Sequence, residues 1–94
     1  MNHPNLRKKL IKAFEQTQKK TSDVNFLINA LLTSSEINDI ALRLEILRRL
    51  SAGETHRSIA ESLGVGIATV TRGSRQLQQS GGTLEKFFKN KNHE

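Results

Sequence analysis

Residues 55–79 contain two stretches of helical spacing separated by a glycine, and this pattern constrains the fold more strongly than any other part of the chain. Thr55 is a good N-cap residue for the first of these helices. The apolar residues of that helix share one face: Ile59, Ala60 and Leu63. Gly64 provides the positive φ angle that a tight turn needs, and a second helix resumes near Ile67. The sequence therefore predicts a helix-turn-helix unit.

The second helix of this unit begins with small residues, although glycine and threonine are poor helix formers. They are expected to be exposed: Gly66, Ala68, Thr69 and Thr71. Val70 is expected to point inward. Small side chains at the start of a helix allow it to approach base edges in the major groove of DNA. Arg57, in the first helix, can form a bidentate pair with O6 and N7 of guanine.

The charge of the chain favours a polyanionic partner. Fifteen Lys and Arg residues against nine Asp and Glu residues give a net charge of +6, and the isoelectric point is near 10.2. Such a surplus attracts nucleic acid, although it also fits a face that only keeps the chain in solution. With four Phe and no Trp or Tyr, the chain lacks a platform for stacking unpaired bases, which favours duplex DNA over RNA. The alternative to DNA binding is that the two helices only pack together or bind another protein.

Apolar spacing predicts further helices on both sides of this unit. A first helix over 5–20 carries apolar residues every four positions: Leu6, Leu10 and Phe14. A second helix, capped by Asp23 or Ser22, carries Val24, Leu27, Ile28 and Leu31. Thr33 and Glu36 have the spacing of a capping box, which predicts a third helix from there to about Ala52, with Gly53 just past its end.

The third predicted helix carries two apolar stripes. One stripe contains Ile37, Ile40, Leu44 and Leu47, and the other contains Leu42, Ile46 and Leu50. A helix with two stripes is buried on more than one side. Few other elements remain in 94 residues to cover both sides, and only 35% of the residues are hydrophobic. These features predict a partner chain.

The remaining sequence completes a single all-α domain of about six helices. Residues 80–83 form a break, after which Leu84, Phe87 and Phe88 indicate a short last helix and a polar tail. The chain has no cysteine and its three histidines are isolated, so we expect no metal site. No arrangement of residues suits catalysis, so we expect no enzyme. No membrane span or signal peptide is evident, and the expected location is the cytoplasm.

Gly73 departs from the usual helix-turn-helix pattern. It lies where the second helix would normally place an apolar residue against the core. Glycine inside a helix costs ~1 kcal/mol relative to alanine, and here we expect it also to leave a gap. One interpretation is a tolerated packing glycine. The other is that a bound molecule fills the gap.

Three segments carry a resemblance to a known family: GIATVTRGS (66–74), LLTSSE (31–36) and RLEILRRL (43–50). Together they resemble the bacterial tryptophan repressor family over roughly residues 29–77. The resemblance implies an intertwined all-helical homodimer that represses transcription at operator DNA, with L-tryptophan as corepressor. It implies one domain over 1–94, with a basic arm and first helix in 1–22, the helix-turn-helix unit in 55–79 and a frayed tail in 91–94.

The resemblance also implies roles for individual residues. Arg43 and Arg72 would sandwich the indole ring, and Arg72 would also meet the ligand carboxylate. The other residues implied for L-tryptophan are Ala30, Leu32, Thr33, Gly73 and Gln76. The residues implied for DNA are Arg57, Gly66, Ile67, Ala68, Thr69, Thr71, Arg72 and Arg75. Within that set, Ile67, Ala68 and Thr69 face the bases, Thr71 and Arg72 contact phosphate, and Arg57 contacts guanine.

The chain departs from the family pattern at several positions. Gln76 replaces a serine that bonds the ligand ammonium; a longer amide can still accept that bond, or it can fill the pocket. The connection between Glu54 and Thr55 is one residue shorter than usual. Ala60 replaces a basic phosphate contact, for which Arg75 can compensate. A related group of small regulators shares this framework without a tryptophan pocket, so DNA binding without tryptophan, or with another small ligand, is the alternative function.

Overall fold

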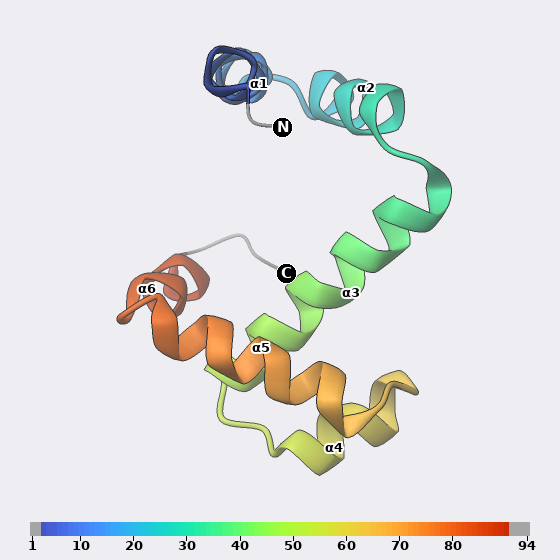
Figure 1. The fold of residues 1–94 in the computed structure, drawn as a ribbon, viewed down its shortest axis with the longest axis vertical. Helices are drawn as coiled ribbons and strands as arrows, with labels where there is room; N and C mark the ends of the chain where they lie inside the picture. Colours follow the sequence, from blue (N-terminus) through green and yellow to red (C-terminus); the bar gives the residue numbers. More distant parts are fainter. Residues whose placement is uncertain (1–2, 91–94) are drawn as a thin grey trace. The chain divides into compact units, whose positions relative to one another are not determined.

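The computed structural model describes residues 3–90, and all regular structure in that range is helical (Figure 1). The helices are α1 (Pro4–Glu15), α2 (Thr21–Leu31), α3 (Ser34–Ser51), α4 (His56–Leu63), α5 (Ile67–Gln79) and α6 (Thr83–Lys89). The predicted all-α class is confirmed. The chain divides into an N-terminal unit that ends at Asn38 and a C-terminal unit that begins at Asp39. The predicted tail, 91–94, lies outside the described residues.

The N-terminal unit differs from the sequence prediction at two helix ends. α1 stops at Glu15 rather than near residue 20. The Thr17 hydroxyl donates a hydrogen bond to the Phe14 carbonyl at 2.6 Å, and this local bond competes with continuation of the helix. The predicted caps of α2 are wrong, because Lys20, in extended conformation, is the N-cap residue and makes no side-chain cap bond. Asp23 already lies in the first turn, where its charge suits the helix dipole.

The start of α3 confirms the predicted capping box. The Glu36 amide donates to the Thr33 hydroxyl at 3.1 Å, and the Thr33 amide donates to the Glu36 carboxylate at 2.9 Å. At the other end, Gly53 has a φ of 93°. The Glu54 amide then bonds back to the Arg49 carbonyl at 3.1 Å, which closes the helix end.

The core of the C-terminal unit is small and joins three helices. Ile46 of α3, Ile59 and Ala60 of α4 and Val70 of α5 are buried. Partly buried apolar residues pack around them: Leu42, Leu50, Leu63 and Val65. One predicted stripe of α3 therefore packs within the chain. The other leaves Ile40 49% and Leu44 51% exposed.

The predicted break before α6 is confirmed. Gly81 and Gly82 have positive φ angles of 60° and 94°. The Ser80 hydroxyl donates to the Leu77 carbonyl at 2.7 Å and accepts from the Leu84 amide at 3.2 Å, so it links the end of α5 to α6. Within residues 3–90, no helix has the length and apolar character needed to cross a bilayer.

The buried isoleucine of α4 tests this core. We expect Ile59→Ala to lower the free energy of unfolding by about 2–4 kcal/mol, because the side chain is fully buried and its loss leaves a cavity. Ile67→Ala makes the same chemical change at a position that is 50% exposed, and we expect it to cost less than about 1 kcal/mol. Urea unfolding at a fixed protein concentration measures both. Equal costs would contradict the described core.

Candidate nucleic-acid interface and ligand site

The predicted helix-turn-helix unit forms as expected. The Thr55 hydroxyl accepts a hydrogen bond from the Ser58 amide at 3.1 Å and caps α4. Gly64 ends α4 with a φ of 68°, and the Val65 amide bonds back to the Ala60 carbonyl at 3.0 Å. α5 then begins at Ile67, and α4 and α5 lie against each other (Figure 1).

The start of α5 presents one buried anchor among exposed residues. Val70 is fully buried against the core. The residues predicted to face the bases, Ile67, Ala68 and Thr69, are exposed, and so is Gly66 before them. Thr71, which was expected to be exposed, is instead half-buried, because it directly follows the buried Val70. Val70 therefore anchors the first turn of α5, and the side chains exposed on this turn are small except for one isoleucine.

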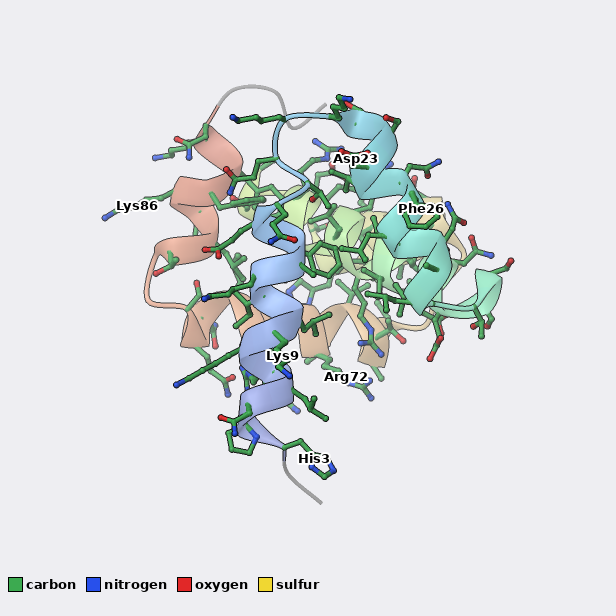
Figure 2. All side chains as sticks on the ribbon, turned by 90° about the horizontal axis from the view of Figure 1, so that it is seen from above. His3, Lys9, Asp23, Phe26, Arg72 and Lys86 are labelled. Atoms are coloured by element: carbon green, nitrogen blue, oxygen red, sulfur yellow. The ribbon has the colours of Figure 1, made fainter. Side chains whose placement is uncertain are left out.

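The charged side chains of this unit are mainly basic. Arg57 on α4 and Arg72 and Arg75 on α5 are all exposed, and α5 contains no acidic residue. Arg72 extends away from its helix (Figure 2). Exposed guanidinium groups on these two helices suit contacts with phosphate oxygens.

Gly73 does not border a gap, and this part of the sequence interpretation is wrong. A Cβ atom built at Gly73 would lie 2.9 Å from Cγ2 of Ile46 and 3.3 Å from Cδ1 of Leu50. The space expected to be empty is filled by α3. Gly73 is therefore a close-packing glycine, which lets the backbone of α5 approach α3 directly.

The residues implied for L-tryptophan fall in both units of the chain. Arg72 and Gln76 lie four residues apart on α5, so they share a face of that helix, and both are exposed. Arg43 is an exposed residue of α3, one turn before Ile46. Ala30, Leu32 and Thr33 lie in the N-terminal unit, where the Thr33 hydroxyl already caps α3.

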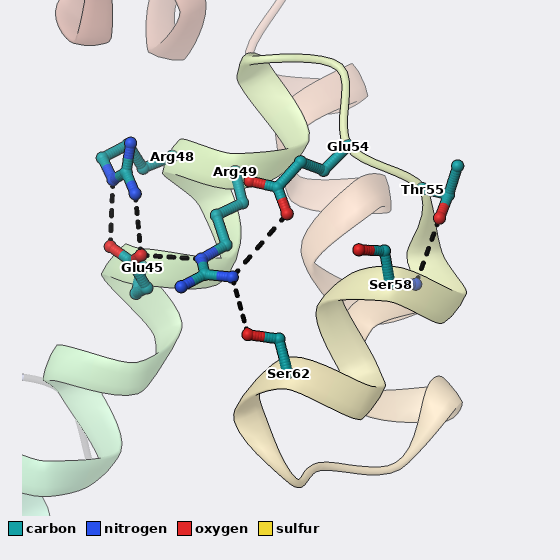
Figure 3. A network of polar contacts seen from close by, with 7 residues as sticks. All are labelled: Glu45, Arg48, Arg49, Glu54, Thr55, Ser58 and Ser62. Atoms are coloured by element: carbon teal, nitrogen blue, oxygen red, sulfur yellow. Dashed lines mark hydrogen bonds and ion pairs between the residues drawn. The ribbon is translucent and has the colours of Figure 1, made fainter.

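The structure adds a polar network that the sequence analysis missed (Figure 3). Glu45 accepts hydrogen bonds from Arg48 at 2.8 and 2.9 Å and from Arg49 at 2.7 Å. Arg49 also donates to the Ser62 hydroxyl at 3.0 Å and lies 3.7 Å from the Glu54 carboxylate. The spacing of Glu45 and Arg49 along one helix was a signal for their ion pair. No sequence pattern signals the contact with Ser62 on another helix.

The electrostatics of this network centre on Glu45. Hydrogen bonds from Arg48 and then Arg49 lower the pKa of Glu45 from 4.5 to about 2. The Glu45 side chain stays 32% exposed, so solvent weakens both pairs.

These features define a class of protein, a helix-turn-helix protein whose second helix presents an exposed first turn. The family model described as "Trp repressor protein" matches residues 7–92. The chain belongs to this family.

Curated relatives carry the name "Trp operon repressor homolog". The protein from Vibrio campbellii is 43% identical over 58 residues, which are 61% of this chain and 58% of that protein. The protein from Chlamydia trachomatis is 43% identical over 63 residues, which are 66% of this chain and 67% of that protein. No solved structure matches the chain significantly.

The contact at Gly73 yields a stability prediction. Gly73→Ala gains ~1 kcal/mol of helix propensity. It also presses a methyl group on Cγ2 of Ile46, a branched and buried side chain that has little freedom to move, and overpacking costs about 1–3 kcal/mol. We therefore expect a net loss of about 1 kcal/mol in urea unfolding. Adding Ile46→Leu removes the branch, and the double mutant should be more stable than the sum of the two changes implies. Strict additivity would contradict the contact.

The Glu45 network yields a pH prediction. A carboxyl group whose pKa is lowered by folding stabilises the fold above its ordinary pKa of 4.5, and this contribution is lost as the pH falls toward 2. We expect Glu45→Gln to lower the free energy of unfolding at pH 6 and to make it less dependent on pH between 5 and 2. Glu61→Gln, at an exposed position of α4, is the control. Unchanged pH dependence in Glu45→Gln would contradict the ion pairs.

Proposed function

We propose that this protein is a DNA-binding transcriptional repressor of the trp operon type, which binds operator DNA as a homodimer with L-tryptophan as corepressor and acts in the cytoplasm. The observation that carries the proposal is the exposed first turn of α5, anchored at Val70, in a member of the Trp repressor family. No enzymatic activity is part of the proposal.

DNA binding rests on the chemistry of α4 and α5. Ile67, Ala68 and Thr69 would lie against base edges in the major groove, with Gly66 allowing close approach. Thr71, Arg72 and Arg75 would contact phosphate, and Arg57 would contact guanine. Thr71 is half-buried, so its side chain would be more restricted than the exposed side chains before it. Arg75 would replace the charge that Ala60 lacks.

Corepressor binding rests on two guanidinium groups near one helix crossing. α5 meets α3 where Gly73 approaches Ile46. Arg72 is next to Gly73, and Arg43 is one turn before Ile46, so both side chains begin near this crossing. Guanidinium planes stack well on aromatic faces, and Arg72 can also pair with the ligand carboxylate. Gly73 would then act by setting the spacing of the two helices rather than by leaving room for the ring.

The other ligand contacts lie farther along the chain. Gln76 shares a face of α5 with Arg72, so its amide would be available to the ligand ammonium. The family pattern also assigns the carbonyl groups of Ala30 and Leu32, with Thr33, to the ligand. These residues belong to the N-terminal unit.

Homodimer formation rests on exposed apolar surface. Ile40 and Leu44 leave one face of α3 half exposed. In the N-terminal unit, the large apolar residues that are 46% to 72% exposed are Leu6, Leu10, Ile11, Phe26 and Leu31. Burying a fully exposed side chain of this kind is worth about 1.5–3 kcal/mol, and these side chains, which are mostly about half exposed, would each gain roughly half of that. A second copy of the chain would cover them, in agreement with the intertwined dimer that the family implies.

A second candidate is a regulator that binds DNA without tryptophan, or with another small ligand. Gln76 favours it, because the longer amide replaces the serine of the family pattern. The two candidates share the DNA-binding face and differ only in the effect of L-tryptophan.

Duplex binding with and without the amino acid tests the proposal. A duplex selected from a random-sequence pool, labelled for fluorescence anisotropy, should bind with a steep salt dependence, and 1 mM L-tryptophan should tighten binding by about 5–150-fold. L-Phenylalanine serves as the control ligand. We expect Arg72→Ala to weaken binding and abolish the effect of L-tryptophan. Tight binding that ignores L-tryptophan would support the second candidate, and no binding to any duplex would contradict both.

A further inference from the structure

We propose that Arg49 is a positioning residue that fixes the orientation of α4 on α3, and through α4 the DNA-binding face of α5. The proposal rests on the proposed function, since the orientation matters only if α5 binds DNA. Arg49 lies in α3, and the hydrogen bonds and the ion pair described for it join it to Glu45, Ser62 and Glu54, none of which is a predicted DNA or ligand contact. Its effect on DNA binding would therefore be indirect.

The guanidinium group of Arg49 is held at three points. Its Nε donates to Glu45 at 2.7 Å on the same helix, and its Nη1 donates to the Ser62 hydroxyl of α4 at 3.0 Å. The same Nη1 lies 3.7 Å from the carboxylate of Glu54, in the turn that joins the two helices. One planar group thus links α3, the turn and the end of α4 (Figure 3).

This bond supplies what the apolar contacts lack. In the described part of the chain, Arg49 to Ser62 is the side-chain hydrogen bond that joins α3 to α4. Packing of Ile46 against Ile59 and Val70 holds the helices together, but apolar burial is not directional. A hydrogen bond from a planar fork depends on angle as well as distance. It therefore resists rotation of α4 about the small core.

The Arg49 side chain is well placed for this task. It is 23% exposed, whereas the Arg48 side chain is 42% exposed, so solvent screens the charge of Arg49 less than that of Arg48. Glu45 holds both guanidinium groups, yet only Arg49 reaches α4. The connection next to Arg49 is also short, because a single turn around Gly53 separates α3 from Thr55. A short turn restricts how far α4 can move relative to α3.

Arg48 provides a matched control for this role. Arg49→Met and Arg48→Met each remove one positive charge and one partner of Glu45 from the same helix. They should therefore change the net charge of the chain, and with it the salt dependence of DNA binding, by similar amounts. Only Arg49→Met removes the link to α4.

The first experiment measures α4 in the free protein. Amide hydrogen exchange should become faster in α4 with Arg49→Met and stay close to the wild-type rate with Arg48→Met. Ser62→Ala should produce the same increase, and Ser62→Thr, which keeps the hydroxyl, should restore slow exchange. Equal exchange in both arginine variants, or an increase with Ser62→Thr as large as with Ser62→Ala, would overturn the proposal. This readout needs no DNA, so it stands whether or not the proposed function holds.

The second experiment measures binding to the selected duplex. We expect Arg49→Met to weaken binding about fivefold more than Arg48→Met does, which corresponds to about 1 kcal/mol. Ser62→Ala should weaken it as well, and Ser62→Thr should bind like the wild type. Faster exchange in α4 with unchanged DNA affinity would overturn the positioning role. If the wild type binds no duplex, the proposed function fails and Arg49 has no DNA-positioning role, even where the exchange data establish the link to α4.

Discussion

The contact between α5 and α3 at Gly73 is the constraint on which the rest of the C-terminal unit depends. The backbone of α5 lies so close to α3 that a Cβ atom would stand 2.9 Å from the Ile46 side chain. Ile46 is itself only 2% exposed and packs in one cluster with Ile59 and Val70. A single side chain of α3 therefore meets both helices of the helix-turn-helix unit. The exposed first turn of α5 keeps its shape because Val70 is anchored there.

Polar contacts add direction to this small core. Four buried residues hold three helices together, and burial alone leaves their rotation weakly defined. The network of Glu45, Arg49 and Ser62 joins α3 to α4, whereas the contact at Gly73 joins α3 to α5. The apolar contact at Gly73 and the directional hydrogen bonds of Arg49 together define the orientation of the helix-turn-helix unit on α3. Such an arrangement suits a protein whose function depends on how two helices are presented to a partner.

Much of the fold was predictable because it depends on residues close in sequence. The features that depend on contacts between distant residues were not predictable. The caps at Thr33 and Thr55 and the turn at Gly64 involve residues close in sequence, and the structure confirms them. The start of α2 at Lys20 has no side-chain cap and so left no signal. The sequence pattern showed that Gly73 is unusual. Whether Gly73 borders a gap or a close contact depended on which α3 residue lies opposite it, and the sequence does not show this. Ser62 lies 13 residues from Arg49, so their bond was beyond any local pattern. The implied DNA and ligand contacts remain predictions.

Calorimetric titration of L-tryptophan tests the central claim most directly. The chain itself contains no Trp, so fluorescence of the ligand can confirm the same binding event. Coupling between two sites is reciprocal, so the amino acid should bind more tightly to the protein–DNA complex than to the free protein, by the same factor with which it tightens DNA binding. We expect saturable binding to the free protein and tighter binding to the complex. Absence of binding, or equal affinity in the two titrations, would contradict the account of a tryptophan-dependent repressor.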